Sequence, residues 1–144
     1  MKLRLQTDFA LRLLMDLARR DAPATLAHVA ADYDISREHL VKVAQRLAAL
    51  GYVNTRPGRG GGVELAADPK SIDVGEVLAG MEGREGVLDC VSDSSACVLE
   101  PGCRLRRLLM RAEDAFYDTL RGTTLASLVS HPTPGRGIAR LPLN

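Results

Sequence analysis

The sequence predicts a mainly α-helical protein: a winged helix-turn-helix domain with a two-stranded wing, then a cysteine loop and a long C-terminal helix. Three observations predict this fold. Apolar residues recur at helical spacing in three runs between residues 7 and 50. A glycine-rich hairpin pattern follows at once, over residues 52–65. A third pattern, over residues 103–120, keeps an apolar helical face for about five turns, as an amphipathic helix does.

The first helix is expected over residues 7–20, and a second, shorter one follows through Leu26, Val29 and Ala30. Thr7 is the expected N-cap of the first, with Asp8 in its first turn. Pro23 ends that pattern, and Thr25 is placed to cap the second helix. The turn at Asp32–Asp34 then leads into the third helix.

The third helix is expected between Ser36, its N-cap, and Gly51, where a left-handed C-cap is favoured. Two short capped helices joined by a tight turn are typical of a helix-turn-helix. Residues 52–55 and 63–65 are expected to form strands around the flexible loop 56–62. Asp73 and Glu76 then form an acidic variant of a capping box before another short helix.

The helix over residues 103–120 has an apolar face that the small N-terminal domain covers only in part. Pairing with a second copy is expected, because two-fold dimers are the commonest homo-oligomers and present two recognition helices to a palindromic site. We therefore divide the chain into a DNA-binding domain (1–82), a cluster-binding loop with a dimerisation helix (83–130) and a flexible tail (131–144).

Charge is segregated along the chain. The 144 residues carry a net charge of only +1, yet residues 1–64 hold ten Lys/Arg against seven Asp/Glu, whereas residues 65–122 hold seven against eleven. A polyanion is therefore expected to bind the N-terminal half. The sequence has neither a secretory signal pattern nor an apolar run of membrane-spanning length, so we expect a cytoplasmic protein.

Candidate DNA-binding residues come from the third helix and the wing. The start of the recognition helix enters the major groove in winged helices, and a cationic, glycine-rich wing suits a narrow minor groove. Arg46, farther along the helix, is expected to contact phosphate or solvent. A charged helix face is usually only solvated, and it is the wing that favours DNA. The candidates are Arg37, Glu38, His39, Lys42, Arg56, Arg59 and Gly60.

The three cysteines of the chain, Cys90, Cys97 and Cys103, lie within fourteen residues of one another. This clustering favours an iron-sulfur or metal site. Most iron-sulfur clusters need a fourth ligand in addition to three cysteines. One disulfide acting as a redox switch, or three inert thiols, are the alternatives. Cys103 also opens a helical pattern, where the helix dipole favours a thiolate.

Several stretches in a fixed order resemble a known family. These are the first helix with Asp8, the stretch ISREHLVKVAQRLAALGYV, the wing RPGRGGGVEL and the cysteine loop before a long helix. Over residues 1–130 the chain resembles the dimeric winged-helix iron-sulfur regulators, a family that includes NsrR and IscR. The resemblance implies a homodimer that binds palindromic operator DNA and carries an iron-sulfur cluster, 4Fe-4S with 2Fe-2S as the alternative.

Within this family, the chain looks more like the nitric-oxide-sensitive repressors. IscR-like members place a histidine three residues beyond the last cysteine, where this chain has Arg106, which cannot ligate iron while protonated. NsrR-like members use an aspartate of the first helix from the partner subunit, and Asp8 matches it. The interval of six residues between Cys90 and Cys97 is one longer than is common in the family. Other potential donors are His28, His39, His131, Asp93 and Glu100.

The resemblance implies a repressor released from DNA when its cluster reacts with nitric oxide. A redox or iron-sulfur-status regulator with a two-iron cluster is the alternative in the same class. An iron-sulfur electron-transfer or cluster-carrier protein is the alternative from another class. An enzyme is not expected, because no motif pairs a nucleophile with a base.

Overall fold

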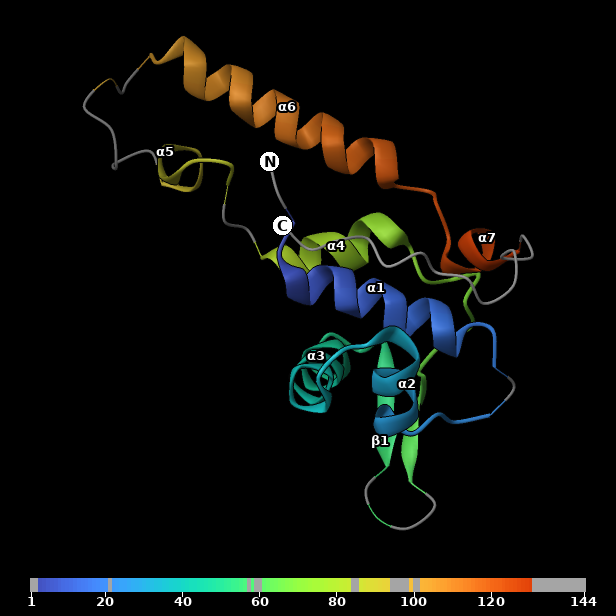
Figure 1. Cartoon of the computed structure of the whole chain (residues 1–144). Helices are drawn as coiled ribbons and strands as arrows, with labels where there is room; N and C mark the ends of the chain where they lie inside the picture. The colour runs from blue at the N-terminus through green and yellow to red at the C-terminus, as the bar shows by residue number, and fades with distance from the viewer. Residues whose placement is uncertain are drawn as a thin grey trace.

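The computed structural model describes residues 3–20, 22–56, 58, 61–83, 86–93, 99 and 102–130. The helices and strands, in chain order, are α1 (Leu5–Leu17), α2 (Leu26–Tyr33), α3 (Arg37–Ala49), β1 (Val53–Arg56), β2 (Gly62–Leu65), α4 (Val74–Glu82), α5 (Asp89–Ser92), α6 (Arg104–Leu120) and α7 (Leu125–Val129) (Figure 1). The predicted mainly helical winged fold is confirmed. No helix in these ranges has the length and apolar character needed to cross a membrane.

The helix-turn-helix is built around one apolar core. The helices α1, α2 and α3 pack together, and each contributes side chains with almost no exposed surface, such as Leu13, Val29 and Leu40. The predicted caps start α2 and α3: Thr25 accepts a hydrogen bond from the His28 amide and Ser36 accepts one from the His39 amide. Because the caps fix where each helix starts, they also fix which residues of α3 face away from the core.

The start of α1 differs from the prediction. The helix begins at Leu5, and Thr7 is a buried residue in its first turns rather than the N-cap. The Thr7 hydroxyl donates a hydrogen bond to the Glu82 carboxylate, which also accepts one from the Arg4 amide at 2.9 Å. A polar side chain buried at this position needs such a partner. The carboxylate therefore joins the start of α1 to the end of α4.

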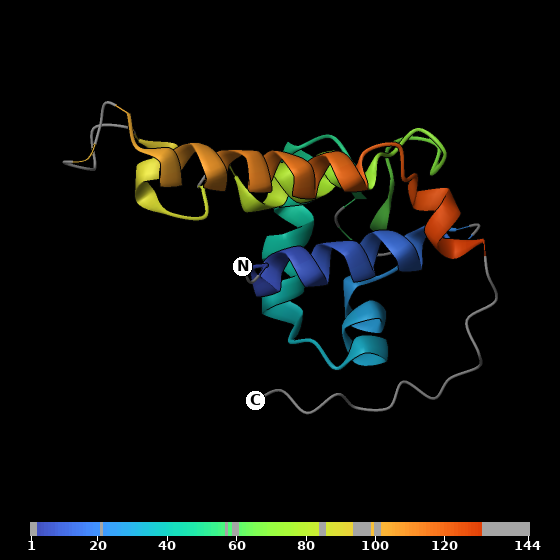
Figure 2. The same cartoon turned by 90° about the horizontal axis from the view of Figure 1, so that it is seen from above.

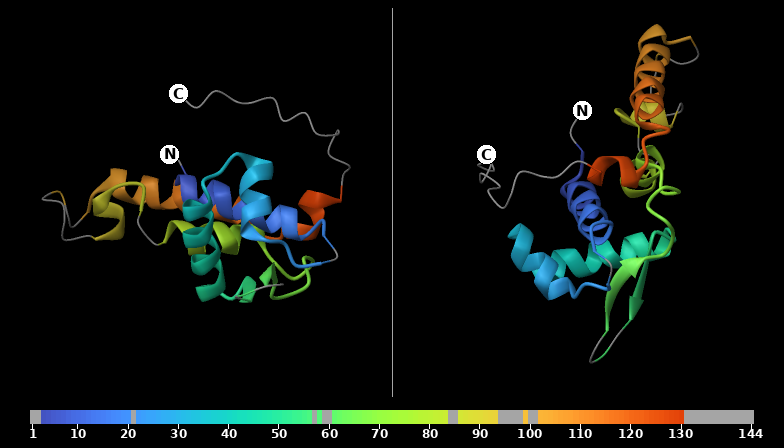
Figure 3. Two further views of the ribbon diagram at one scale, coloured as in Figure 1. Left: turned by 60° about the horizontal axis from the view of Figure 1, so that its bottom comes forward. Right: turned by 90° about the vertical axis from the view of Figure 1, so that its right-hand side faces the viewer.

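The wing is a two-stranded antiparallel hairpin in which Val53 pairs with Leu65 and Arg56 with Gly62. Its second strand also pairs with the segment before α2, because Val63 and Ala24 exchange backbone hydrogen bonds of 2.8 and 2.9 Å. A Cβ atom at Gly62 would lie 2.8 Å from the Ala24 carbonyl oxygen, so this approach requires glycine. The hairpin projects from the helical body (Figure 3).

The chain returns to the N-terminal core after α6. Asp73 caps α4 by accepting from the Glu76 amide at 3.0 Å, as predicted, and it also accepts from the Gly122 amide at 2.6 Å. Leu125, in α7, is buried in the same core as α1 and α3. The last described helix is therefore part of the N-terminal core, although it lies beyond the long helix in the sequence.

The long helix α6 lies over α4 and beside α5 (Figure 2). It has no buried residue, and its Leu105 and Leu108 side chains are 58 % and 59 % exposed. At its C-terminal end, burial raises the pKa of Tyr117, and the nearby carboxylates of Glu113 and Glu82 raise it further. The helix is thus partly covered near α4, whereas its N-terminal half presents an open apolar face.

Candidate DNA interface and cysteine site

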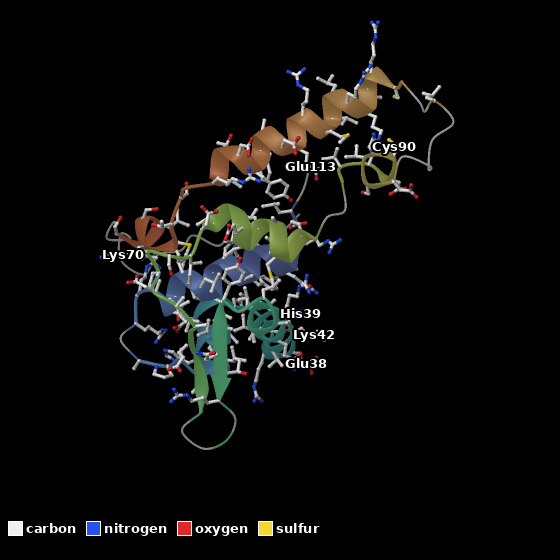
Figure 4. The ribbon with its side chains drawn as sticks, turned by 180° about the vertical axis from the view of Figure 1, so that it is seen from behind. Glu38, His39, Lys42, Lys70, Cys90 and Glu113 are labelled. Atoms are coloured by element: carbon white, nitrogen blue, oxygen red, sulfur yellow. The ribbon has the colours of Figure 1, made fainter. Side chains whose placement is uncertain are left out.

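The N-terminal half of α3 exposes Arg37, Glu38, His39 and Lys42, the residues predicted to contact the major groove. Their exposure follows from the opposite face of α3, where four apolar residues are buried in the core. The His39 ring lies beside that of Phe9 on α1, with the ring centroids 6.5 Å apart. Figure 4 shows Glu38, His39 and Lys42 together on α3, on the wing side of the molecule.

Two of the arginines considered for DNA contact are engaged within the chain. The Arg56 guanidinium forms an ion pair with Glu64 across the wing, with N and O atoms 2.8 Å apart. The Arg46 guanidinium donates a hydrogen bond to the Gly80 carbonyl at 3.0 Å and so ties α3 to α4. Arg46 is nevertheless exposed, so the expectation that it contacts phosphate or solvent stays a prediction. The wing residues Arg59 and Gly60 lie outside the described residues.

The cysteine segment runs beside the first turn of α6. Cys90 lies in the one-turn helix α5, and Cys103 is the N-cap of α6; both thiols are free and half-buried. Cys97 lies outside the described residues. Sequence periodicity could not reveal α5, because four residues are too few to show a helical repeat. In Figure 4, Cys90 lies beside α6, on the side of α4 opposite to α3 and the wing.

Arg106 connects the two described cysteines. Its Nε donates a hydrogen bond of 2.6 Å to the Cys90 carbonyl, and its Nη2 donates one of 3.4 Å to the Val91 carbonyl. Its backbone amide donates to the Cys103 sulfur at 3.5 Å. Arg106 could be excluded as a ligand from its residue type, but no pattern in the sequence indicated these contacts.

Asp8 lies in the first turns of α1 and forms an ion pair with Arg12, with N and O atoms 2.9 Å apart. Within the described part of the chain, no three His, Cys, Asp or Glu side chains gather closely enough to hold a metal ion. Of the other potential donors, His28 pairs with Asp32, whereas Glu100 and His131 lie outside the described residues.

The donor set present is suited to an iron-sulfur cluster. Thiolates are the usual cluster ligands, and the amide that donates to the Cys103 sulfur stabilises a negative charge there. Because Cys103 is the N-cap of a helix of 17 residues, the helix dipole adds to this stabilisation. The residues that could hold such a group are Cys90, Cys97 and Cys103.

Comparisons with known proteins agree with this architecture. Residues 3–131 match the model of the Rrf2 family, described as an iron-dependent transcriptional regulator. The chain is 40 % identical over 134 residues to the transcriptional regulator NsrR of Bacillus subtilis, covering 91 % of this chain and 92 % of that protein. It is 40 % identical over 136 residues to the transcriptional repressor NsrR of Streptomyces coelicolor, covering 92 % and 91 % of the two chains.

Solved structures show the same fold. CymR, the global cysteine regulator of B. subtilis, superposes with a TM-score of 0.74 at 24 % identity, covering 92 % of this chain and 99 % of that one. IscR of T. potens superposes with a TM-score of 0.72 at 20 % identity, covering 90 % and 87 %.

The resemblance to NsrR that the sequence indicated is thereby confirmed. The expectation that the chain is not an enzyme agrees with the names of these relatives, which are transcriptional regulators. The family match spans the helix-turn-helix, the wing, the cysteine segment and the long helix together. Since every described residue lies inside that match, the protein belongs to the Rrf2 family of transcriptional regulators.

Proposed function

We propose that the protein is a dimeric iron-sulfur transcriptional repressor of the cytoplasm, which binds palindromic operator DNA and leaves it when its cluster reacts with nitric oxide. The observation that carries this proposal is the pairing of an exposed α3 face with a separate thiol segment in a chain 40 % identical to NsrR proteins. Arg37, Glu38, His39 and Lys42 would contact the major groove, and Arg56, Arg59 and Gly60 the flanking minor groove.

Cys90, Cys97 and Cys103 would hold the cluster, and Asp8 of the partner subunit would supply the fourth ligand. The cluster, 4Fe-4S or 2Fe-2S, supplies iron that nitric oxide can attack. A carboxylate is a harder ligand than a thiolate, so the iron beside Asp8 is the expected point of attack. Ligation by Asp8 requires its ion pair with Arg12 to open.

The dimer would form through α6. Its exposed leucines form an apolar face that a second copy can bury, and a two-fold axis would place the two α3 helices against the two halves of a palindrome. In this proposal residues 83–130 form the cluster and dimer unit, although α7 packs in the core of residues 1–82.

In this proposal, the packing of α1 against α3 connects Asp8 to the DNA-contacting residues. Asp8 lies on α1, which packs directly against α3. The start of α1 is also tied through Thr7 and Glu82 to the end of α4, just before the cysteine segment. A change in what Asp8 binds would therefore act on the helix that carries the DNA-contacting residues.

The proposal is tested by replacing each cysteine with alanine and purifying the proteins without oxygen. We expect each single variant to lose iron and sulfide, because three thiolates are already the minimum for stable attachment. Each should also lose salt-dependent binding to a palindromic duplex selected from a random library. Full iron and sulfide content in all three variants would refute the cluster site. A wild-type protein that holds its cluster but shows no salt-dependent binding to duplex DNA would favour a cluster carrier instead.

A further inference from the structure

The guanidinium of Arg106 holds the helix that carries Cys90 against the helix that begins at Cys103. Its two hydrogen bonds to the carbonyls of Cys90 and Val91 cross from α6 to α5, and its own amide donates to the Cys103 sulfur. One residue thus contacts both described cysteines, through its side chain on one and its backbone on the other. We call these three contacts the Arg106 clamp.

The position of Arg106 in α6 explains its reach. It is three residues past the N-cap Cys103, and helical side chains point back toward the N-terminus of their helix. The side chain therefore extends over the first turn of α6 toward α5. It meets the carbonyls near the C-terminal end of α5, where a helix presents partial negative charge.

The α5 turn depends on such support. It has only four residues, none of them buried, and its N-cap Leu88 makes no side-chain capping bond. Its own loop is closed by the Gly86 amide, which donates to the Ser92 hydroxyl at 2.6 Å. A Cβ atom at Gly86 would lie 2.7 Å from Val91, so the loop is shaped as a tight unit. This closure shapes the turn but does not attach it to α6.

We infer that Arg106 is a positioning residue, which sets the Cys90 turn beside Cys103 before the cluster is assembled. A planar guanidinium can serve two carbonyls at once, whereas a lysine ammonium cannot reproduce that fork. Groups held in place beforehand lose less entropy when they bind a ligand. The inference rests on the proposed function only in taking the thiols as cluster ligands, since the clamp is a property of the chain itself.

The clamp is tested first in the full-length protein without its cluster. Backbone ¹⁵N heteronuclear NOE values of residues 89–92 report the order of the α5 turn on the picosecond to nanosecond scale. We expect Arg106→Ala to lower these values to those of a mobile loop. Arg107→Ala, which removes the neighbouring exposed arginine, should leave them unchanged. Equal values in Arg106→Ala and Arg107→Ala would overturn the inference.

The second measurement uses the loaded protein and an iron chelator. We expect iron loss to be about tenfold faster in Arg106→Ala, about 1.4 kcal/mol by the relation between rate and barrier, with an altered visible circular dichroism spectrum. Arg106→Lys keeps the positive charge, and its rate of iron loss should lie between those of the wild type and Arg106→Ala. Wild-type behaviour of Arg106→Lys would show that charge alone matters and would also overturn the inference. If wild-type protein binds no cluster, the proposed function fails, while the NOE values still decide whether the clamp exists.

Discussion

Buried polar contacts between distant residues join the parts of this regulator. Thr7 and Glu82 are 75 positions apart, yet the hydroxyl of one donates to the carboxylate of the other. The Glu82 side chain is only 14 % exposed, so water cannot easily replace a lost partner. The pair therefore fixes the start of α1, and with it Asp8, against the end of α4.

The first prediction concerns this hydrogen bond. Thr7→Val keeps the shape of the side chain but removes the donor to Glu82. We expect the free energy of unfolding of the cluster-free protein to fall by about 1.5–3 kcal/mol, as for a hydrogen bond to a charged group. Urea unfolding measures the change, and Thr7→Ser, which keeps the hydroxyl, is the matched control. A larger loss in Thr7→Ser than in Thr7→Val would show that the methyl group, and not the hydrogen bond, is what matters.

Three of the four predicted N-cap side chains were correct, whereas Thr7 lies inside α1. Thr25, Ser36 and Asp73 cap their helices as expected, because a cap bonds to an amide only three residues away. The contacts of Thr7 with Glu82 and of Arg106 with Cys90 could not be predicted. Each contact depends on how separate helices pack against each other, and the spacing of residues along the sequence does not indicate this packing.

At the scale of elements, α3 and α6 differ in which of their side chains are exposed. The buried face of α3 anchors it in the core, which leaves its cationic residues exposed beside the wing. The opposite arrangement holds for α6, which has no buried residue and exposes Leu105, Leu108 and Met110. One helix thus presents charged side chains to solvent, and the other presents apolar surface.

The second prediction tests α3. Lys42→Ala should reduce the dependence of operator binding on salt by about one counterion, and it should cost about 1–3 kcal/mol of binding if the lysine also contacts a base. Lys70→Ala is the matched control, because Lys70 is also exposed but lies far from α3 in Figure 4. Fluorescence anisotropy over a series of salt concentrations gives both quantities. Equal effects of the two substitutions would contradict the docking of α3 in the major groove.

The third prediction tests α6. Leu108→Asp places a charge on the exposed apolar face, and burial of a leucine contributes about 1.5–3 kcal/mol. Since a two-fold interface contains the residue twice, the dimer should dissociate at a concentration about 100-fold higher or more. Leu128→Asp, at a leucine of α7 that is 38 % exposed, is the control. Sedimentation velocity distinguishes monomer from dimer in each variant. A stable Leu108→Asp dimer would show that the interface does not include this face of α6.

At the scale of the whole molecule, the proposed DNA-contacting residues lie apart from the described cysteines. The exposed residues of α3 and the wing lie on one side of α1 and α4, and Cys90 lies on the other (Figure 4). Apart from α5, the order of the helices and strands could be predicted from the sequence, but the return of α7 to the core could not. Leu125 belongs to a short apolar run that has no periodicity to mark which core it joins.

The fourth prediction concerns the ligand shared between subunits. A mixed dimer combines one subunit carrying Asp8→Ala with one carrying Cys97→Ala. If Asp8 ligates across the dimer, one site loses both altered ligands and the other is intact. We then expect about half the wild-type cluster with a normal spectrum. If Asp8 ligates within its own subunit, each site has one defect, and only abnormal or absent clusters would be found.

The central claim is that the state of the cluster controls binding to the operator. Its most direct test follows both quantities in one anaerobic titration of the loaded dimer with nitric oxide, using native mass spectrometry for the cluster and fluorescence anisotropy for a selected palindromic duplex. We predict that the fraction of duplex bound falls in step with loss of the intact cluster. Cluster-free Cys90→Ala protein should bind weakly from the start and not respond. Undiminished DNA binding after every cluster has reacted would contradict the account.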